Sequence, residues 1–92
     1  MSLKTFTIIG SGNVATHIGK ALQGQGYIIN GVFSHTLSNA EQLAAALHCP
    51  ATDRLDSVPA ADAFLFSVKD SALPSLASEI VKRFGKTPIY IH

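Results

Sequence analysis

Short apolar runs and helix-like patterns alternate along the chain. Runs rich in β-branched and aromatic residues are typical of strands, whereas apolar residues three and four positions apart are typical of amphipathic helices. The pattern predicts strands at residues 5–9, 27–33, 49–52, 63–68 and 88–91. It predicts helices from about Asn13 to the glycines at 24 and 26, from about Ser38 to Leu47, and over residues 72–84.

Particular residues suit the predicted helix ends. Glu41 follows Ser38 by three positions, which is the spacing of a capping box. Pro74 is tolerated in the first turn of the third helix, and Gly85 ends that helix. Asn13 can cap the first helix or donate to a phosphate, and capping is the simpler role.

Strands that alternate with helices form βαβ units and therefore a parallel sheet. The run 63–66 is apolar at every position, as expected for a strand that is covered on both faces. Right-handed crossovers then place the first strand in the middle of the sheet. We predict an α/β fold of the Rossmann type, a doubly wound parallel sheet in three layers with the strand order 3-2-1-4-5.

Composition limits the classes of function. The 92 residues are enough for one small domain, and 47% of them are hydrophobic against 14% charged. This balance is apolar for so small a domain and suggests that part of its surface is covered by something else. The net charge of +1 gives no support to a nucleic-acid partner.

The sequence also indicates the compartment and the absence of a metal site. Its apolar runs are too short for a signal peptide or a membrane span, so a cytoplasmic setting is expected. The single cysteine, Cys49, forms no internal disulfide and is expected to be a small buried hydrophobe. The four histidines lack ligand spacing with Cys49 or with each other, so no metal is expected.

The most informative motif is Gly-Ser-Gly-Asn-Val-Ala at 10–15, a G-x-G-x-x-A pattern between a predicted strand and a predicted helix. Gly10 permits a tight turn, Gly12 lets a pyrophosphate approach the backbone, and Ala15 lets helix and strand pack closely. The start of the helix presents free N–H groups and a partial positive charge to the phosphates. The residues assigned here to cofactor binding are Gly10, Ser11, Gly12, Asn13 and Val14.

The second predicted strand is followed by Ser34, His35 and Thr36, with no acid. This position lies about 20 residues beyond the glycine turn, where NAD enzymes place Asp or Glu on the ribose 2′-hydroxyl. An acid would repel a 2′-phosphate, whereas two hydroxyls and an imidazole that can carry positive charge can hydrogen-bond it. We therefore predict NADP as the cofactor and assign these three residues to it, although the usual arginine is absent.

The segment after the fourth predicted strand lies where ligands bind in open α/β sheets. We assign Val68 and Lys69 to the cofactor, on its nicotinamide side, and expect Asp70 or Ser71 to cap the next helix. The catalytic residues are left unassigned. Lys69 and His92 are the titratable candidates near the strand ends, and both can equally be cofactor or structural residues.

Together these segments resemble the N-terminal domain of the pyrroline-5-carboxylate reductase-like and deazaflavin-dependent NADP oxidoreductase superfamily. The chain is similar in particular to a bacterial branch of proposed NADP oxidoreductases whose C-terminal half is helical. The matching segments are residues 9–17, 32–36, 66–70 and 90–92, which span the chain in the family's order. The family often has Arg in place of His35, so this chain departs from it at the 2′-phosphate position.

The resemblance implies a hydride-transfer enzyme that acts on a small-molecule substrate and dimerises through the helical half. Residues 1–92 would then be the NADP-binding Rossmann domain of a longer, two-domain protein, because the sequence stops as a strand finishes. Alone the chain should be inactive, since a second domain usually closes the substrate pocket.

Two alternatives remain. One is a regulatory module that senses a dinucleotide without catalysis, and the other is a methyltransferase-like domain that binds S-adenosylmethionine. Both usually have an acid at the end of the second strand, where this chain has none.

Overall fold

Five parallel strands form one sheet in the described part of the computed structural model, residues 3–69 and 71–92. The strands are β1 (Thr5–Gly10), β2 (Ile28–Phe33), β3 (Ala51–Thr52), β4 (Ala63–Ser67) and β5 (Ile89–Ile91). The helices are α1 (Asn13–Gly24), α2 (Leu37–Leu47) and α3 (Leu73–Phe84), with a short 3₁₀ turn, η1 (Leu55–Ser57). The strand order is β3-β2-β1-β4-β5, which confirms the predicted doubly wound fold.

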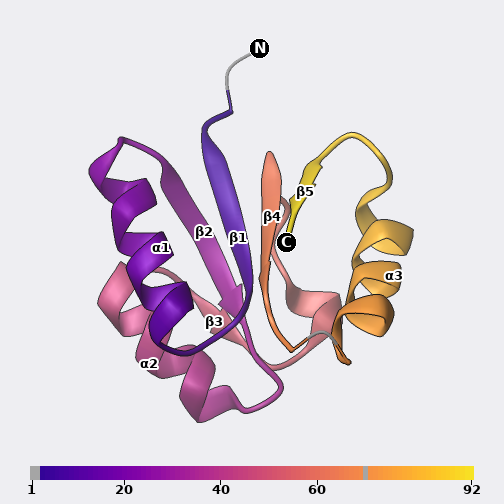
Figure 1. Ribbon diagram of the computed structural model, residues 1–92, viewed down its shortest axis with the longest axis horizontal. Helices are drawn as coiled ribbons and strands as arrows, with labels where there is room; N and C mark the ends of the chain where they lie inside the picture. Colours follow the sequence, from indigo (N-terminus) through magenta and orange to yellow (C-terminus); the bar gives the residue numbers. More distant parts are fainter. Residues whose placement is uncertain (1–2, 70) are drawn as a thin grey trace.

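The helices lie on both faces of the sheet (Figure 1). α1 and α2 pack against one face and α3 against the other, which gives the three predicted layers. Crossovers between parallel strands are right-handed, so a reversal in the direction of strand placement moves the next helix to the opposite face. That reversal falls between β1 and β4, which are neighbours in the sheet.

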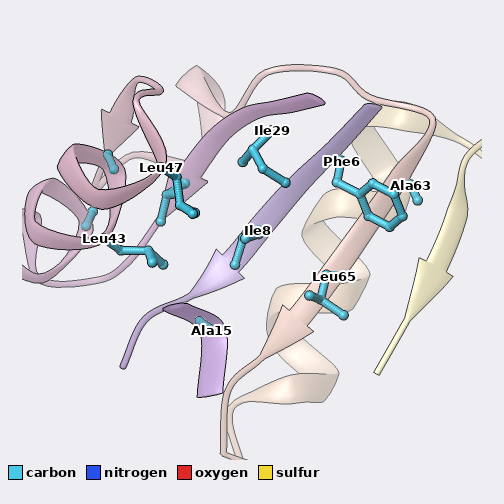
Figure 2. Packing of buried hydrophobic residues seen from close by; sticks show 11 residues of the cluster. Phe6, Ile8, Ala15, Ile29, Leu43, Leu47, Ala63 and Leu65 are labelled. Carbon is cyan, nitrogen blue, oxygen red and sulfur yellow. The ribbon is translucent and has the colours of Figure 1, made fainter. Parts of the chain in front are cut away.

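Two apolar cores fill the space between the layers. The core under α1 and α2 contains Phe6, Ile8, Ala15, Ile29, Leu43, Leu47, Ala63 and Leu65, and Figure 2 shows how these side chains meet. The core under α3 contains Ile9, Phe33, Val58, Phe64, Phe66, Leu76 and Ile80. β1 is buried from Phe6 to Gly10 because both of its faces are covered.

Two small residues let α1 approach its neighbours closely. Ala15 is fully buried, as the motif predicts. A Cβ added to Gly19 would lie 2.6 Å from Leu47 Cδ1 of α2 and 3.2 Å from Ile8 Cδ1 of β1. Glycine inside a helix costs up to about 1 kcal/mol relative to alanine, and this close packing offsets the cost.

α1 begins at Asn13, as predicted, but its cap differs from the prediction. Gly12 is the N-cap and no side chain caps the helix, so the predicted cap by Asn13 is wrong. Asn13 is the first helical residue instead. The Gly12 carbonyl already accepts hydrogen bonds from the Thr16 N–H at 3.0 Å and the Thr16 hydroxyl at 2.8 Å, which sets the first turn one residue earlier.

The start of α2 also lies earlier than predicted. The helix begins at Leu37, and its N-cap is Thr36, whose carbonyl accepts the Ala40 N–H at 3.1 Å. Ser38 therefore lies inside the first turn, where it cannot act as the N-cap. The predicted capping box between Ser38 and Glu41 is wrong for this reason.

α3 begins at Leu73, one residue later than predicted, with Pro74 in its first turn as expected. Its N-cap is Ala72, and no side chain forms a cap hydrogen bond, so the alternative cap by Ser71 is not formed. Asp70, the preferred cap, lies outside the described residues.

β3 is shorter than the predicted run 49–52. His48 ends α2 in the left-handed conformation (φ 55°), and Pro50 has no N–H to donate to a neighbouring strand. Cys49 lies between them and is partly buried against the core under α1 and α2. This burial raises the pKa of the Cys49 thiol above its ordinary value.

Side chains close the amino edge of the sheet. Asp62 Oδ2, before β4, accepts the N–H groups of Lys4 and Thr5 at 2.9 and 3.1 Å, and Thr5 Oγ1 accepts the Asp62 N–H at 2.9 Å. Asn30 of β2 donates to the carbonyl of Ala60 at 2.8 Å. The two backbone N–H donors hold the pKa of the Asp62 carboxyl below its usual range.

Candidate functional site

The loops that follow β1, β2 and β4 surround a hollow of about 290 Å³ at the carboxyl edge of the sheet. We call it the carboxyl-edge hollow. Its lining residues are Gly10, Ser11, Phe33, Ser34, His35, Ser67, Val68, Lys69, Ser71, Ala72 and Leu76. The hollow lies beside the β1–β4 junction, where the strand order reverses and where open α/β sheets bind their ligands.

Gly10 is required where the ends of β1 and β4 meet. Its φ is +122°, and an added Cβ would lie 2.1 Å from the carbonyl oxygen of Ser67 and 3.1 Å from Val68 Cγ1. Only glycine therefore lets these two strand ends approach each other. The motif therefore has glycine at position 10 because the backbone of β1 packs directly against the backbone of Ser67 at this turn.

Gly12 has a different environment, although it also has a positive φ, +108°. No atom lies within 4 Å of the place where its Cβ would be, and the residue is exposed. α1 starts immediately after it, without a side-chain cap and without an acid in its first turn. Bare backbone, uncapped N–H groups and a partial positive charge at one place suit a phosphate group.

The loops after β1 and β2 meet through two serine hydroxyls. Ser11 Oγ and Ser34 Oγ lie 3.5 Å apart, and the Thr36 N–H donates to Ser34 Oγ at 3.4 Å. Ser34 is buried, whereas His35 is exposed and sets its ring edge-to-face against Phe33, with 5.3 Å between the ring centroids. This loop thus presents hydroxyls and an imidazole beside the glycine turn.

Val68 and Lys69 line the same hollow as Ser34 and His35. The sequence places these two residues on the nicotinamide side of the cofactor, and the structure shows that they line one hollow with the loop after β2. Lys69 is exposed and adds a cationic side chain to the hollow.

An apolar wall of the hollow was missed in the sequence. It is formed by Phe33, Ala72 and Leu76. Ala72 and Leu76 are four residues apart, so they share the buried side of α3 and of the turn before it. The spacing of Ala72 and Leu76 could have indicated that they share one side of a helix. It could not have indicated that this side of α3 extends to the carboxyl ends of the strands.

A second hollow of about 320 Å³ lies between α1 and α2, on the other side of the glycine turn. Ser11 lines both hollows. Gly12 and Asn13 line the second one, together with Thr16, Asn39, Gln42, Leu43 and Ala46. Its polar side chains are all uncharged hydroxyls and amides, and sequence patterns gave no sign of it.

Two predicted site residues lie outside these linings. The side chain of Val14 is 64% exposed on α1, and Thr36 reaches the site through its backbone N–H on Ser34. Among the described lining residues of the carboxyl-edge hollow, His35 and Lys69 are the titratable ones. Within residues 3–69 and 71–92, there is no group of three or more His, Cys, Asp or Glu residues that could hold a metal ion.

Comparison with known proteins gives both a family and a fold. The model of the family described as NADP oxidoreductase coenzyme F420-dependent matches residues 5–91. A proposed NADP oxidoreductase from Bacteroides fragilis, known as a crystal structure, superimposes with a TM-score of 0.89 at 34% identity. That match covers 97% of this chain and 35% of the Bacteroides chain.

More distant structures share the fold. The WlbA dehydrogenase of Bordetella pertussis, solved with NADH and UDP-GlcNAcA, has a TM-score of 0.76 at 15% identity over 97% of this chain and 28% of its own. UDP-N-acetylglucosamine 3-dehydrogenase of Acidithiobacillus ferrooxidans has a TM-score of 0.75 at 22% identity over 89% of this chain and 26% of its own. This chain therefore spans about a quarter to a third of the length of these structures.

A comparison with curated proteins and a search for membrane-spanning helices both gave negative results. No curated protein matches the chain. Within the described residues, none of the helices has the length and apolar character needed to cross a membrane.

Proposed function

Because this chain belongs to the NADP oxidoreductase coenzyme F420-dependent family, we propose that it is the part of an oxidoreductase that holds NADP(H) in the carboxyl-edge hollow. The observation that carries the proposal is the meeting of three loops at one hollow beside Gly12, where the missing side chain leaves open space. A dinucleotide needs bare backbone for its pyrophosphate and a partly apolar pocket for its adenosine.

The pyrophosphate would lie against Gly12 and the start of α1. The open space at the Gly12 Cβ position admits a phosphate to the backbone, and the first turn of α1 has no side-chain cap to displace. Ser11 lines the hollow next to this position and can donate its hydroxyl. Anions at an uncapped helix N-terminus are stabilised by its N–H groups and its dipole.

The adenosine would lie between the loops after β2 and β4. Phe33, Val68 and Leu76 supply apolar surface, and the edge-to-face contact with Phe33 holds the His35 ring beside them. We therefore propose contacts of Val68 with the adenosine end, because it shares the hollow with His35.

The 2′-phosphate would be recognised by Ser34, His35 and Thr36, with Lys69 as a cationic neighbour. No acid stands in this loop to repel a phosphate. Hydrogen bonds to a charged phosphate are roughly twice as strong as neutral ones. This donor set favours NADP over NAD and compensates for the arginine that the family often has in place of His35.

When bound, NADPH supplies the hydride. The residues of this chain bind and orient it, and we assign His35 and Lys69 to binding, not to acid–base catalysis. The substrate, a small molecule, would meet its acid–base groups on the rest of a longer, homodimeric protein. We expect the 92-residue chain to bind NADP(H) and to turn over no substrate.

The test uses two nucleotides that differ only at the 2′ position. Adenosine 2′,5′-bisphosphate should bind more tightly than adenosine 5′-monophosphate by about tenfold in titration calorimetry, and NADPH should exceed NADH by a similar factor. Equal affinities within each pair would contradict recognition of the 2′-phosphate. Failure of all four ligands to bind would contradict the dinucleotide site itself.

A further inference from the structure

Ser67, at the carboxyl end of β4, has a side-chain hydroxyl that the fold does not use. Within residues 3–69 and 71–92, this hydroxyl forms no hydrogen bond. The residue is partly buried and lines the carboxyl-edge hollow. A partly buried hydroxyl without a protein partner is left to water or to a ligand. The sequence motifs assigned no role to this serine.

The backbone of Ser67 is held directly against the glycine turn. Ser67 pairs with Gly10 in the register of β4 and β1. A Cβ added to Gly10 would collide with the Ser67 carbonyl oxygen, so the two strand ends touch through their backbones. This contact lies at the junction where the strand order reverses. The hydroxyl of Ser67 therefore has a fixed place beside the turn that leads to Gly12.

Ser67 and its neighbour Val68 point to opposite sides of the sheet. Side chains alternate along a strand, and in β4 Leu65 belongs to the core under α1 and α2 while Phe66 belongs to the core under α3. Ser67 follows Phe66 in the same strand, so its side chain points to the α1 side. Val68 packs against the core under α3. The two neighbours can therefore contact different parts of one ligand.

We propose that the Ser67 hydroxyl binds the ribose of the nicotinamide half of NADP(H). The inference rests on the proposed function, which puts the 2′-phosphate at the loop after β2, the pyrophosphate at Gly12 and the adenosine against Val68. β2, β1 and β4 are neighbours in that order. A dinucleotide that runs from the loop after β2 past Gly12 next reaches the end of β4, and the unit after its pyrophosphate is the nicotinamide ribose.

The chemistry of the hydroxyl and its direction both suit this ribose. A serine hydroxyl donates one hydrogen bond and accepts others, as the two free hydroxyls of the ribose do. The adenosine is proposed to lie on the α3 side, against Val68, and Ser67 points to the other side, that of α1. A hydrogen bond to this ribose orients the half of the cofactor that transfers the hydride.

The experiment measures the binding of three nucleotides to the wild type, Ser67→Ala and Ser34→Ala by titration calorimetry. Adenosine 2′,5′-bisphosphate contains the adenosine half alone, 2′-phospho-ADP-ribose adds the second phosphate and the second ribose, and NADPH adds the nicotinamide. Ser34→Ala is the matched control, because Ser34 lines the same hollow from the loop after β2. Circular dichroism establishes that each variant is folded.

Ser67→Ala should weaken the binding of 2′-phospho-ADP-ribose and of NADPH by about fivefold and change that of adenosine 2′,5′-bisphosphate by less than about twofold. Ser34→Ala should weaken all three ligands, because the contact that it removes lies at their shared adenosine half. A general disturbance of the hollow by Ser67→Ala would also weaken all three ligands, so the pattern across the ligands separates a contact with the ribose from a structural effect.

Equal losses for all three ligands in Ser67→Ala would overturn the inference, as would unchanged affinities. A loss confined to NADPH would assign the hydroxyl to the nicotinamide ring and overturn the assignment to the ribose. Failure of the wild type to bind any of the three ligands would instead contradict the proposed function, and the inference would fall with it.

Discussion

At the amino edge of the sheet the chain satisfies its own backbone, whereas at the carboxyl edge it leaves backbone groups available. Asp62 accepts two backbone N–H groups where β1 begins, and Asn30 donates to the carbonyl of Ala60. At the other edge α1, α2 and α3 all begin without a side-chain cap hydrogen bond. Uncapped helix starts need water or a ligand to satisfy their N–H groups.

The difference separates residues that build the sheet from residues that serve a ligand. A change at the amino edge should alter stability and leave ligand affinity unaltered, and some changes at the carboxyl edge should do the reverse. Gly10 is an exception, since it stands at the carboxyl edge but its contacts are with β4. Four substitutions test this separation.

The largest effect is expected for Gly10→Ala. The new Cβ would lie 2.1 Å from the Ser67 carbonyl oxygen at a φ of +122°, so β1 and β4 must separate. We expect a loss of about 3 kcal/mol or more, a large part of the stability of a small domain. The measurement is thermal unfolding by circular dichroism. Gly24→Ala is the control, because Gly24 lies inside α1 and nothing lies within 4 Å of its Cβ position. A melting curve of Gly10→Ala that equals the wild-type curve would refute the packing argument.

The next effect concerns Gly12→Val, which should abolish NADPH binding in a folded protein. Its side chain would occupy the open space proposed for the pyrophosphate, and we expect affinity to fall about 100-fold or more, equal to about 3 kcal/mol. Gly26→Val is the matched control, because Gly26 has a φ of +92° and equally open space at the far end of α1.

Both variants should lose similar stability, about 1–3 kcal/mol, because both force a side chain into the left-handed region. Only Gly12→Val should lose the cofactor, as measured by titration with NADPH. Retention of NADPH affinity in folded Gly12→Val would remove the glycine turn from the binding site.

A smaller effect is expected for Ser34→Asp, which should reverse the preference for NADPH over NADH. The new carboxylate would repel the 2′-phosphate and accept a hydrogen bond from a ribose 2′-hydroxyl, shifting the ratio of the two affinities by about tenfold or more. Ser78→Asp adds the same charge on the exposed side of α3, outside the lining of the hollow, and should leave the ratio unchanged. An unaltered ratio in Ser34→Asp would show that this loop does not contact the 2′ position.

The smallest effect is expected at the amino edge, for Asp62→Asn. The pKa of Asp62 is lowered by the N–H groups of Lys4 and Thr5, so its contribution to stability is present above the ordinary carboxyl pKa of about 4 and is lost as the pH falls through the lowered value. The variant should melt a few degrees lower near neutral pH and approach the wild type in acid.

NADPH affinity in Asp62→Asn should equal that of the wild type, and Asp53→Asn serves as a control for removing an exposed loop carboxylate. A variant that melts like the wild type at neutral pH would show that the Asp62 hydrogen bonds do not stabilise the amino edge. A changed affinity for NADPH would break the separation between the two edges.

Hydrophobic spacing was enough to predict the strand order, because five apolar runs separated by helical segments allow few right-handed arrangements. The sequence did not predict the helix caps. Ser38 has the spacing of a capping box, but the carbonyl of Thr36 had already begun the helix. A capping pattern depends on where the first turn closes, and tertiary packing of α2 against β2 and β3 decides that.

The sequence by itself determined the glycine turn and the acid-free loop after β2, because each depends on which side chains are missing at a given spacing. Only the tertiary structure decided that Val68 and Lys69 share a hollow with His35, and that Leu76 forms its wall. It alone showed that Ile89 and Ile91 stay exposed while Ala63 and Leu65, with which they pair, are buried. These facts depend on which helix or loop packs over which strand. The sequence pattern shows that one face of a strand is apolar, but it does not show which element buries that face.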